Sequence, residues 1–538
     1  MGKRSPEPPP VAARRGRRPQ GLDDDTPLDE RFGGVAARLA WVLRTTRLAY
    51  DGGRFAKAAD FAQHLRELGL RADATRVSRW ESAEFATTAA GAAYETGFGM
   101  RPGSLTALLD GISRSLGDTT PPPPPRRDVG AADVLRIETA LETVLAPGRT
   151  GLDWLDLAQA VRGRDQVFLP RSTWQQLADT LVGELSRSVG LAYVTRFEAL
   201  CTLLGHPRAQ GHVVDATMTY VADPACQVAI DAILVLEHVR AARATDAVIE
   251  LLGTGRGSLV RGATWTAVVK LARGQVDDAQ LAALVEALAA AVAAEPTPAV
   301  LADLGWVLSR VPSRPRALMR RTFREQGLTL PAVQRQSSLA RLPEPQRSTV
   351  ERLVADAEAG ARIPASGGML ERLVLEALFH PFRERKHQAG LILMVSPYAA
   401  ALARSCTEVA AAADDTALVT ELTRLLTYLA TDAEVDRLYA WVAGERGSAH
   451  ARGALLSLAH VPHEPRADLL VRTIEHGPAE LRGPALYAAG MLGLAELAGL
   501  QDPTRFPPRT VAAAAWWQRE GGALRDVPHP NSAPVRRR

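Results

Sequence analysis

The chain has little cysteine and no long apolar run. Three cysteines in 538 residues cannot form a disulfide framework, so we exclude a disulfide-stapled secreted protein and expect a reducing compartment. The most apolar stretches, Leu281–Ala294 and Gln388–Ala403, are too short to cross a bilayer, and Glu286 interrupts the first. The start, MGKRSPEPPP, lacks the apolar core of a signal peptide. These absences predict a cytoplasmic protein that makes no membrane contact.

Lysine is also scarce, and the positive charge is unevenly placed. Only four of the 64 basic residues are lysine, which together with the heavy use of alanine is typical of a GC-rich genome. The net charge is +4, yet residues 1–127 carry 20 Lys and Arg against 15 Asp and Glu, whereas the remainder carries 44 against 45. This excess favours an anionic partner for the first quarter of the chain. The alternative is that Arg14, Arg15, Arg17 and Arg18 form a solvated tail.

Catalytic and metal-binding motifs are missing as well. The sequence has no GxSxG elbow, no HExxH pair and no P-loop, so we expect neither an enzyme nor a bound cofactor. Gly253–Gly257 could cradle a phosphate, but no strand precedes it, and a turn between helices explains it better. Cys201, His206 and His212 lack a fourth metal ligand. We interpret these histidines as helix caps and expect no metal site.

Composition divides the chain into five segments. Five consecutive prolines, Pro121–Pro125, form a stiff polyproline spacer, which separates two folding units rather than joining packed helices. The first residues are rich in Pro, Arg and Asp without apolar periodicity, which predicts disorder. The expected segments are a disordered basic arm, a small helical domain, the proline-rich linker, an α-helical repeat domain and a flexible tail (1–28, 29–118, 119–129, 130–523 and 524–538).

The large C-terminal segment shows helical periodicity almost throughout. Apolar residues recur at three- and four-residue spacing without alternating strands, so an all-α fold is expected. Two segments 30 residues apart, Ala451–Leu456 and Leu481–Leu486, have similar sequences, and Val260–Trp265 has the same pattern. A small residue at the inner position lets neighbouring helices approach closely, and the pattern is similar to HEAT-type two-helix repeats. A non-repetitive helical bundle is the alternative.

The small N-terminal segment has a more specific pattern. Its third expected helix contains Val77 and Trp80 three residues apart, so both face inward. The outward edge of this helix is then polar and basic, which is what a DNA-recognition helix requires. The residues on this edge are Thr75, Arg76, Ser78, Arg79 and Ser82. The helices expected in this segment include Val35–Tyr50, Phe55–Leu68, Ala74–Glu84 and Pro102–Leu116.

This segment resembles the Cro/repressor-like (XRE-type) helix-turn-helix family. The resemblance covers about 80 residues and is carried by Val77–Glu81 and by Tyr94–Leu105, whose wording is similar to that of actinobacterial members. It implies a five-helix domain that binds double-stranded DNA. By the family pattern Thr75, Arg76 and Arg79 meet bases, Ser78 and Ser82 meet phosphate, and Trp80 and Glu81 are structural. A five-helix bundle that binds protein instead is the alternative.

The sequence therefore predicts a sequence-specific DNA-binding transcriptional regulator, associated with the nucleoid when bound. Its HEAT-like domain is expected to bind a protein partner or an effector. The resemblance implies a homodimer, with its contact on the repeat domain or on the fifth helix. A protein-interaction scaffold anchored through the small domain is the second interpretation, and an enzyme with an unrecognised site is the third.

Overall fold

The computed structural model describes residues 22–118, 126, 128–330, 343–361, 363 and 367–526. These residues form helices joined by turns and contain no strand, with one isolated bridge between Ser188 and Leu524. The predicted all-α fold is confirmed. Pro121–Pro125 lie outside the described residues, as does most of the predicted basic arm.

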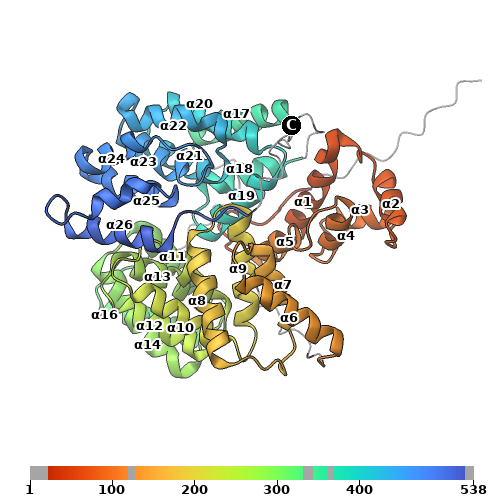
Figure 1. The fold of residues 1–538 in the computed structure, drawn as a ribbon, viewed down its shortest axis with the longest axis horizontal. Helices are drawn as coiled ribbons and strands as arrows, with labels where there is room; N and C mark the ends of the chain where they lie inside the picture. Colours follow the sequence, from red (N-terminus) through yellow and green to blue (C-terminus); the bar gives the residue numbers. More distant parts are fainter. Residues whose placement is uncertain are drawn as a thin grey trace, which may run out of the picture.

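The N-terminal part contains five helices, at the right of Figure 1. Their bounds are α1 (Val35–Ala49), α2 (Ala58–Glu67), α3 (Ala74–Trp80), α4 (Ala90–Gly97) and α5 (Thr106–Leu116). The second and third helices are shorter than predicted. The third ends at Trp80 rather than at Glu84, because Glu81 leaves the helical conformation and turns into the core.

The remaining helices form two lobes, lower and upper in Figure 1. The first lobe contains α6 (Ala131–Leu145), α7 (Gly151–Val161), α8 (Arg171–Arg187), α9 (Leu191–Leu204), α10 (Gln210–Ala222), α11 (Ile230–Leu234), α12 (Ala242–Leu252), α13 (Gly257–Ala272), α14 (Asp278–Ala294), α15 (Pro298–Arg310) and α16 (Ser313–Glu325). The second contains α17 (Glu344–Ala361), α18 (Met369–Phe379), α19 (Arg383–Val395), α20 (Ala399–Ala412), α21 (Thr416–Leu429), α22 (Val435–Ala440), α23 (Ser448–Leu458), α24 (Ala467–His476), α25 (Ala479–Met491) and α26 (Pro508–Glu520).

Helices in both lobes stack on the helix two positions further along the chain. In the first lobe α7 packs on α9, α8 on α10 and α12 on α14; in the second, α19, α21, α23 and α25 form one continuous layer. A two-helix unit stacked on its neighbour gives this arrangement, so the fold is repeat-like, as the spacing of similar segments predicts.

Small residues allow the close stacking. Gly453 of α23 faces Thr423 of α21, and Gly262 of α13 faces Ile233 of α11; a Cβ at either position would press on that neighbour. Both glycines follow an arginine in the repeated sequence pattern, and they are the small inner residues that this pattern predicts. Gly483, the third glycine of this pattern, serves no such contact, because a Cβ added there would meet no atom within 4 Å.

The N-terminal helices are not separate from the lobes, contrary to the prediction from the polyproline run. Helix α5 packs between α9 and α19, and Trp41 of α1 stacks on Tyr398 with ring centroids 6.0 Å apart. The spacer prediction failed because a linker sets only the distance along the chain between two units, whereas their docking depends on the complementary surfaces that they carry.

Both ends of the described chain are packed rather than loose. Leu22 and Leu28, predicted to lie in the disordered arm, are 2% and 5% exposed, and Asp24 is ion-paired with Arg38. At the other end, Leu524 N donates to Arg187 O at 2.9 Å, although a flexible tail is predicted from residue 524. Apolar burial and charge pairing tie down both segments.

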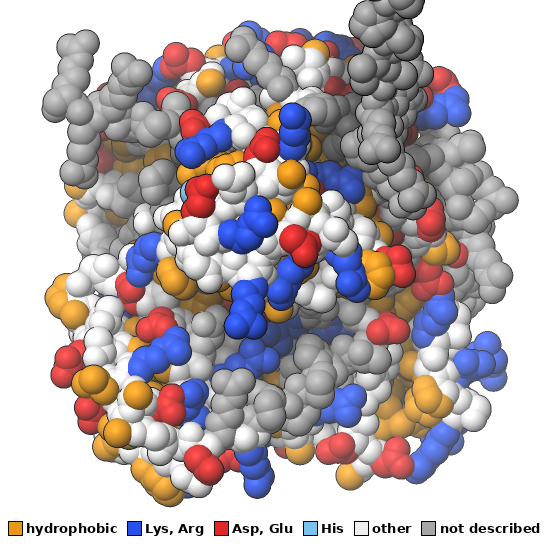
Figure 2. Space-filling model, turned by 90° about the vertical axis from the view of Figure 1, so that its right-hand side faces the viewer, with side chains coloured by type: hydrophobic (Ala, Val, Ile, Leu, Met, Phe, Trp, Pro, Cys, Tyr) orange, Lys and Arg blue, Asp and Glu red, His pale blue; other side chains and the backbone are white. Residues whose placement is uncertain are grey.

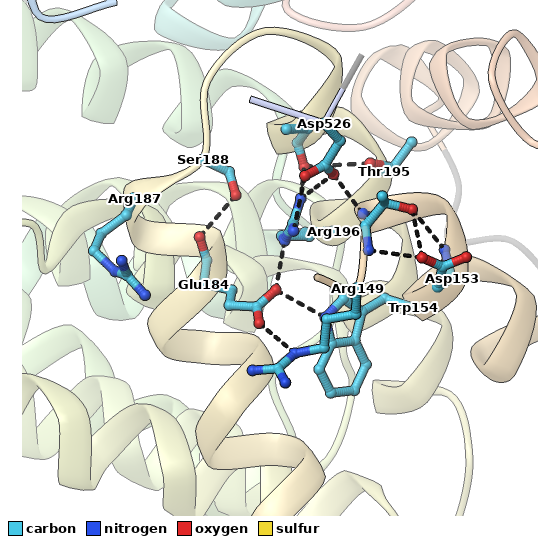
Figure 3. A network of polar contacts seen from close by, with 12 residues as sticks. Arg149, Asp153, Trp154, Glu184, Arg187, Ser188, Thr195, Arg196 and Asp526 are labelled. Carbon is cyan, nitrogen blue, oxygen red and sulfur yellow. Dashed lines mark hydrogen bonds and ion pairs between the residues drawn. The ribbon is translucent and has the colours of Figure 1, made fainter. Parts of the chain in front are cut away.

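The C-terminal segment joins the last helices to the first lobe through a polar network (Figure 3). Asp526 accepts hydrogen bonds from the Arg196 guanidinium and from Gly151 N at the start of α7. Arg196 Nε also donates to Glu184 at 2.8 Å, and Trp154 Nε1 donates to the same carboxylate at 2.9 Å. Asp526 therefore fixes the N-terminus of α7 against α8 and α9.

Candidate nucleic-acid interface

Helix α3 is capped at its start and anchored to its domain at its end. Asp73 caps it, with its carboxylate accepting from Arg76 N at 2.7 Å. At the other end Glu81 is 3% exposed and accepts two hydrogen bonds from Arg47 of α1, at 2.6 and 2.7 Å, and one from the hydroxyl of Tyr94 of α4, at 2.5 Å. Burial and the neighbouring Glu81 carboxylate raise the pKa of Tyr94, so its hydroxyl remains a donor.

The predicted contact residues lie on the outer side of α3. Thr75, Arg76, Ser78 and Arg79 are exposed, while Val77 between them is fully buried. Ser82 follows the helix, is half-buried, and donates its hydroxyl to Arg79 O at 2.9 Å. The structure thus places four of the five residues on one exposed edge and the fifth at its margin.

Two aromatic rings orient the arginines of this edge. The guanidinium carbon of Arg76 lies 5.3 Å from the centroid of Trp80, and that of Arg79 lies 4.2 Å from Phe85. Trp80 is half-buried, not fully buried as predicted, and Phe85 is 39% exposed. Sequence reasoning missed Phe85, although an exposed phenylalanine six residues after an arginine in a polar turn is a usable signal.

A shallow hollow of about 410 Å³ opens on this edge. Its lining combines cationic, hydroxyl and aromatic groups from Asp73, Thr75, Arg76, Arg79, Trp80, Phe85 and Thr87. Figure 2 looks onto this side of the molecule, where Lys and Arg side chains stand out on the protruding N-terminal helices. Guanidinium forks beside small hydroxyl groups can donate to base edges and to phosphate oxygens.

The opposite side of the N-terminal part carries buried charges that bind it to the second lobe. Arg38 of α1 donates to Asp24 and to Glu376 of α18, both at 2.7 Å, and Arg385 lies 3.4 Å from Glu376. Burial alone raises the pKa of Glu376, but the charges of Arg38 and Arg385 outweigh it and lower the pKa to about 2. Glu376 is therefore an ionised, fully paired partner of α1.

Further ion pairs hold α5 and the loop before it against the first lobe. Arg114 pairs with Glu198 of α9, and Arg101 pairs with Asp153 of α7 at 2.7 Å. Every residue of α5 is buried or half-buried. Of the two places expected for a homodimer contact, the fifth helix and the repeat domain, the fifth helix has no exposed residue, because its surface packs within the chain.

The residues considered for other chemistry lie apart from this edge. Among the described residues, no group of three or more His, Cys, Asp or Glu is arranged to hold a metal ion. His206 Nε2 lies 3.3 Å from Arg164 O, and His212 Nδ1 lies 2.9 Å from Gln175 Oε1. Gly253–Gly257 forms the turn between α12 and α13.

No described helix is by itself long and apolar enough to cross a membrane; α19 and α20 reach that length and composition only together, across a 120° bend. No protein-family model matches the chain, and no curated protein matches it significantly.

Proposed function

We propose that the protein is a sequence-specific DNA-binding transcriptional regulator that inserts α3 into the major groove. One observation carries the proposal: α3 presents Thr75, Arg76, Ser78 and Arg79 on its free edge, while Val77 and Glu81 anchor the other side. The resemblance to actinobacterial members of the XRE-type family supports it. Such a protein acts in the cytoplasm, on the nucleoid, without a catalytic step.

The edge is also accessible to a duplex. The larger contacts between the N-terminal helices and the lobes involve α5, and α3 lies at the right of Figure 1, away from both lobes. A duplex is about 20 Å wide, and its major groove admits one helix. In this arrangement the lobes hold the small domain from behind and leave its reading edge free.

Selection of duplexes from a random pool with the full-length chain, followed by binding measurements, tests the proposal. Arg79→Ala should lose about 1–3 kcal/mol of preference for the selected duplex over a scrambled one, because a bidentate contact to guanine is lost. Binding to the scrambled duplex should change little. Arg452→Ala, which removes an exposed arginine on α23, serves as the matched control.

Two results would refute the proposal. One is that no duplex is enriched over the random pool. The other is that Arg79→Ala remains as selective as the parent while its thermal unfolding is unchanged. Deletion of residues 1–20 should act differently, because Arg14, Arg15, Arg17 and Arg18 can contact only phosphates or the minor groove: binding to all duplexes should weaken and become less dependent on salt.

A homodimer on DNA remains part of the proposal, with its contact on the lobes. A second candidate function is a protein-interaction scaffold anchored through the N-terminal helices. It is favoured by exposed apolar side chains at the edge of the first lobe, where Leu135 of α6 is 66% exposed and Phe168 is 73% exposed. Sedimentation of the full chain with and without a selected duplex distinguishes a dimer on DNA from a monomeric scaffold.

A further inference from the structure

The most basic part of the described chain lies far from α3. Residues 298–330 contain six arginines against two acidic residues, Asp303 and Glu325, a net charge of +4 that equals that of the whole chain. These residues form α15, α16 and the segment that follows. Helix α16 lies at the left of Figure 1, at the opposite side of the view from α3.

A groove of about 510 Å³ runs between α15 and α16. Arg316, Arg320 and Arg324 line it from α16, four residues apart. At 1.5 Å per residue, each is about 6 Å along the helix from the next, and the three span about 12 Å on one face. The groove therefore presents a row of three guanidinium groups.

These three arginines differ from the others of the same helix. Arg314 pairs with Asp278 at 2.7 Å and Arg321 with Glu325 at 3.8 Å, so the charges outside the groove are neutralised. Within the described part of the chain, no acidic side chain lines the groove or pairs with its arginines. A solvated, charge-balanced helix face does not explain this one-sided distribution.

The innermost arginine is partly desolvated. Arg316 Nη2 donates to Val311 O at 2.8 Å, whereas its Nε is buried and has no hydrogen-bond partner among the described residues. A buried N–H without an acceptor is unfavourable, so the Arg316 guanidinium is incompletely paired within the described part of the chain. Arg320 and Arg324 are exposed at the groove mouth and can contact the outer part of a ligand seated in the groove.

The floor of the groove is apolar. Leu308 and Phe323 are 8% and 1% exposed, and Leu328 is half-buried at the rim. A volume of this size with apolar walls and a few convergent polar groups is typical of sites for small organic ligands. Arginine forks match phosphate oxygens in geometry and charge.

We propose that the groove between α15 and α16 binds a small organic molecule with two or more phosphate groups. The phosphates pair with Arg316, Arg320 and Arg324, and the organic part packs on Leu308 and Phe323. A row about 12 Å long suits several linked phosphates better than one. The site does not depend on DNA binding, because its residues lie on other helices than α3.

Calorimetric titration of the full chain with adenosine diphosphate, pyrophosphate and orthophosphate tests the site. We expect saturable binding of one adenosine diphosphate per chain, weaker binding of pyrophosphate because it lacks the organic part, and the weakest binding of orthophosphate. The double variant Arg320→Gln/Arg324→Gln should weaken adenosine diphosphate binding about tenfold or more, since two charge-assisted contacts are lost.

The matched control removes the same charge from the same helix outside the groove. Arg314→Gln/Arg321→Gln should bind adenosine diphosphate as the parent does. Equal weakening in both double variants would show general electrostatic attraction and overturn the proposal. So would the absence of saturable binding, or tighter binding of citrate or of a poly-glutamate peptide than of adenosine diphosphate. All four arginines are exposed, and unchanged thermal unfolding of both variants verifies that the fold is kept.

Discussion

Replacement of Glu376 by glutamine tests whether buried charges hold the N-terminal helices to the second lobe. Glu376 is fully buried in α18 and faces three arginines: Arg372 at 2.6 Å, Arg38 at 2.7 Å and Arg385 at 3.4 Å. Glutamine keeps the shape of the side chain but removes its charge. Among the described residues, Asp24 is then the one carboxylate still paired with Arg38 and Arg385.

The expected loss of stability follows from two arguments. Removing one partner of a buried ion pair costs about 3–5 kcal/mol. The pKa of Glu376 falls from 4.5 to about 2 on folding, and a shift of that size corresponds to about 3 kcal/mol. Because the folded pKa is the lower one, this stability is present above pH 4.5 and is lost as the pH falls towards 2. We expect Glu376→Gln to lower the free energy of unfolding by about 3 kcal/mol at pH 7.

Urea denaturation followed by circular dichroism measures the effect. The difference in unfolding free energy between Glu376→Gln and the parent should be large at pH 7. It should narrow at pH 3, because that pH lies below the unfolded pKa of 4.5 and the carboxylate is then mostly protonated in the unfolded chain. The control is Glu142→Gln, which replaces an exposed glutamate on α6 and should leave the free energy of unfolding unchanged at both pH values. A Glu376→Gln variant as stable as the parent at pH 7 would refute the role of the network.

Two further predictions concern helix packing and the C-terminal segment. Gly490→Ala should destabilise the protein by about 1–3 kcal/mol in thermal unfolding, because the added methyl group overlaps the Trp517 indole. Gly111→Ala is the control: a Cβ there meets nothing within 4 Å, so this variant should be more stable by about 0.5–1 kcal/mol. Equal effects of the two substitutions would contradict the packing argument. Asp526→Asn should lower the free energy of unfolding by about 3 kcal/mol in urea titrations, because the buried Arg196 loses its second carboxylate partner. An unchanged free energy of unfolding would indicate that this ion pair does not hold the C-terminal segment.

Local elements could be predicted from the sequence because their determinants are local. The start of α3 follows from the capping residue Asp73, and the exposure of Arg76 and Arg79 follows from the position of Val77. The end of α3 was predicted wrongly, because the inward turn of Glu81 depends on Arg47, which is 34 residues away. Helical spacing therefore identifies the exposed edge of α3 but does not show what anchors that helix.

The docking of the N-terminal helices could not be predicted from the proline run. It rests on pairs such as Arg31 with Glu384 and Arg38 with Glu376, separated by 353 and 338 residues. In an arginine-rich sequence each of these arginines is indistinguishable from a surface charge. One signal was available: Leu39–Leu43 are five consecutive apolar residues, and a helix that is apolar on most sides is one that neighbours surround.

Under the proposed function, the docking of α1 and α5 also restricts how two copies of the chain assemble on DNA. A dimer that reads two half-sites about 34 Å apart needs a two-fold contact that fixes both copies of α3. Since α5 has no exposed residue and α1 is held by Arg38, we propose that the lobes supply that contact. The orientation of each reading edge is then set by the buried ion pairs within a chain, and the spacing between the two edges by the contact between lobes. Glu376→Gln should therefore weaken binding to a two-half-site duplex more than binding to a single half-site, because a loosened α1 no longer holds both edges in register.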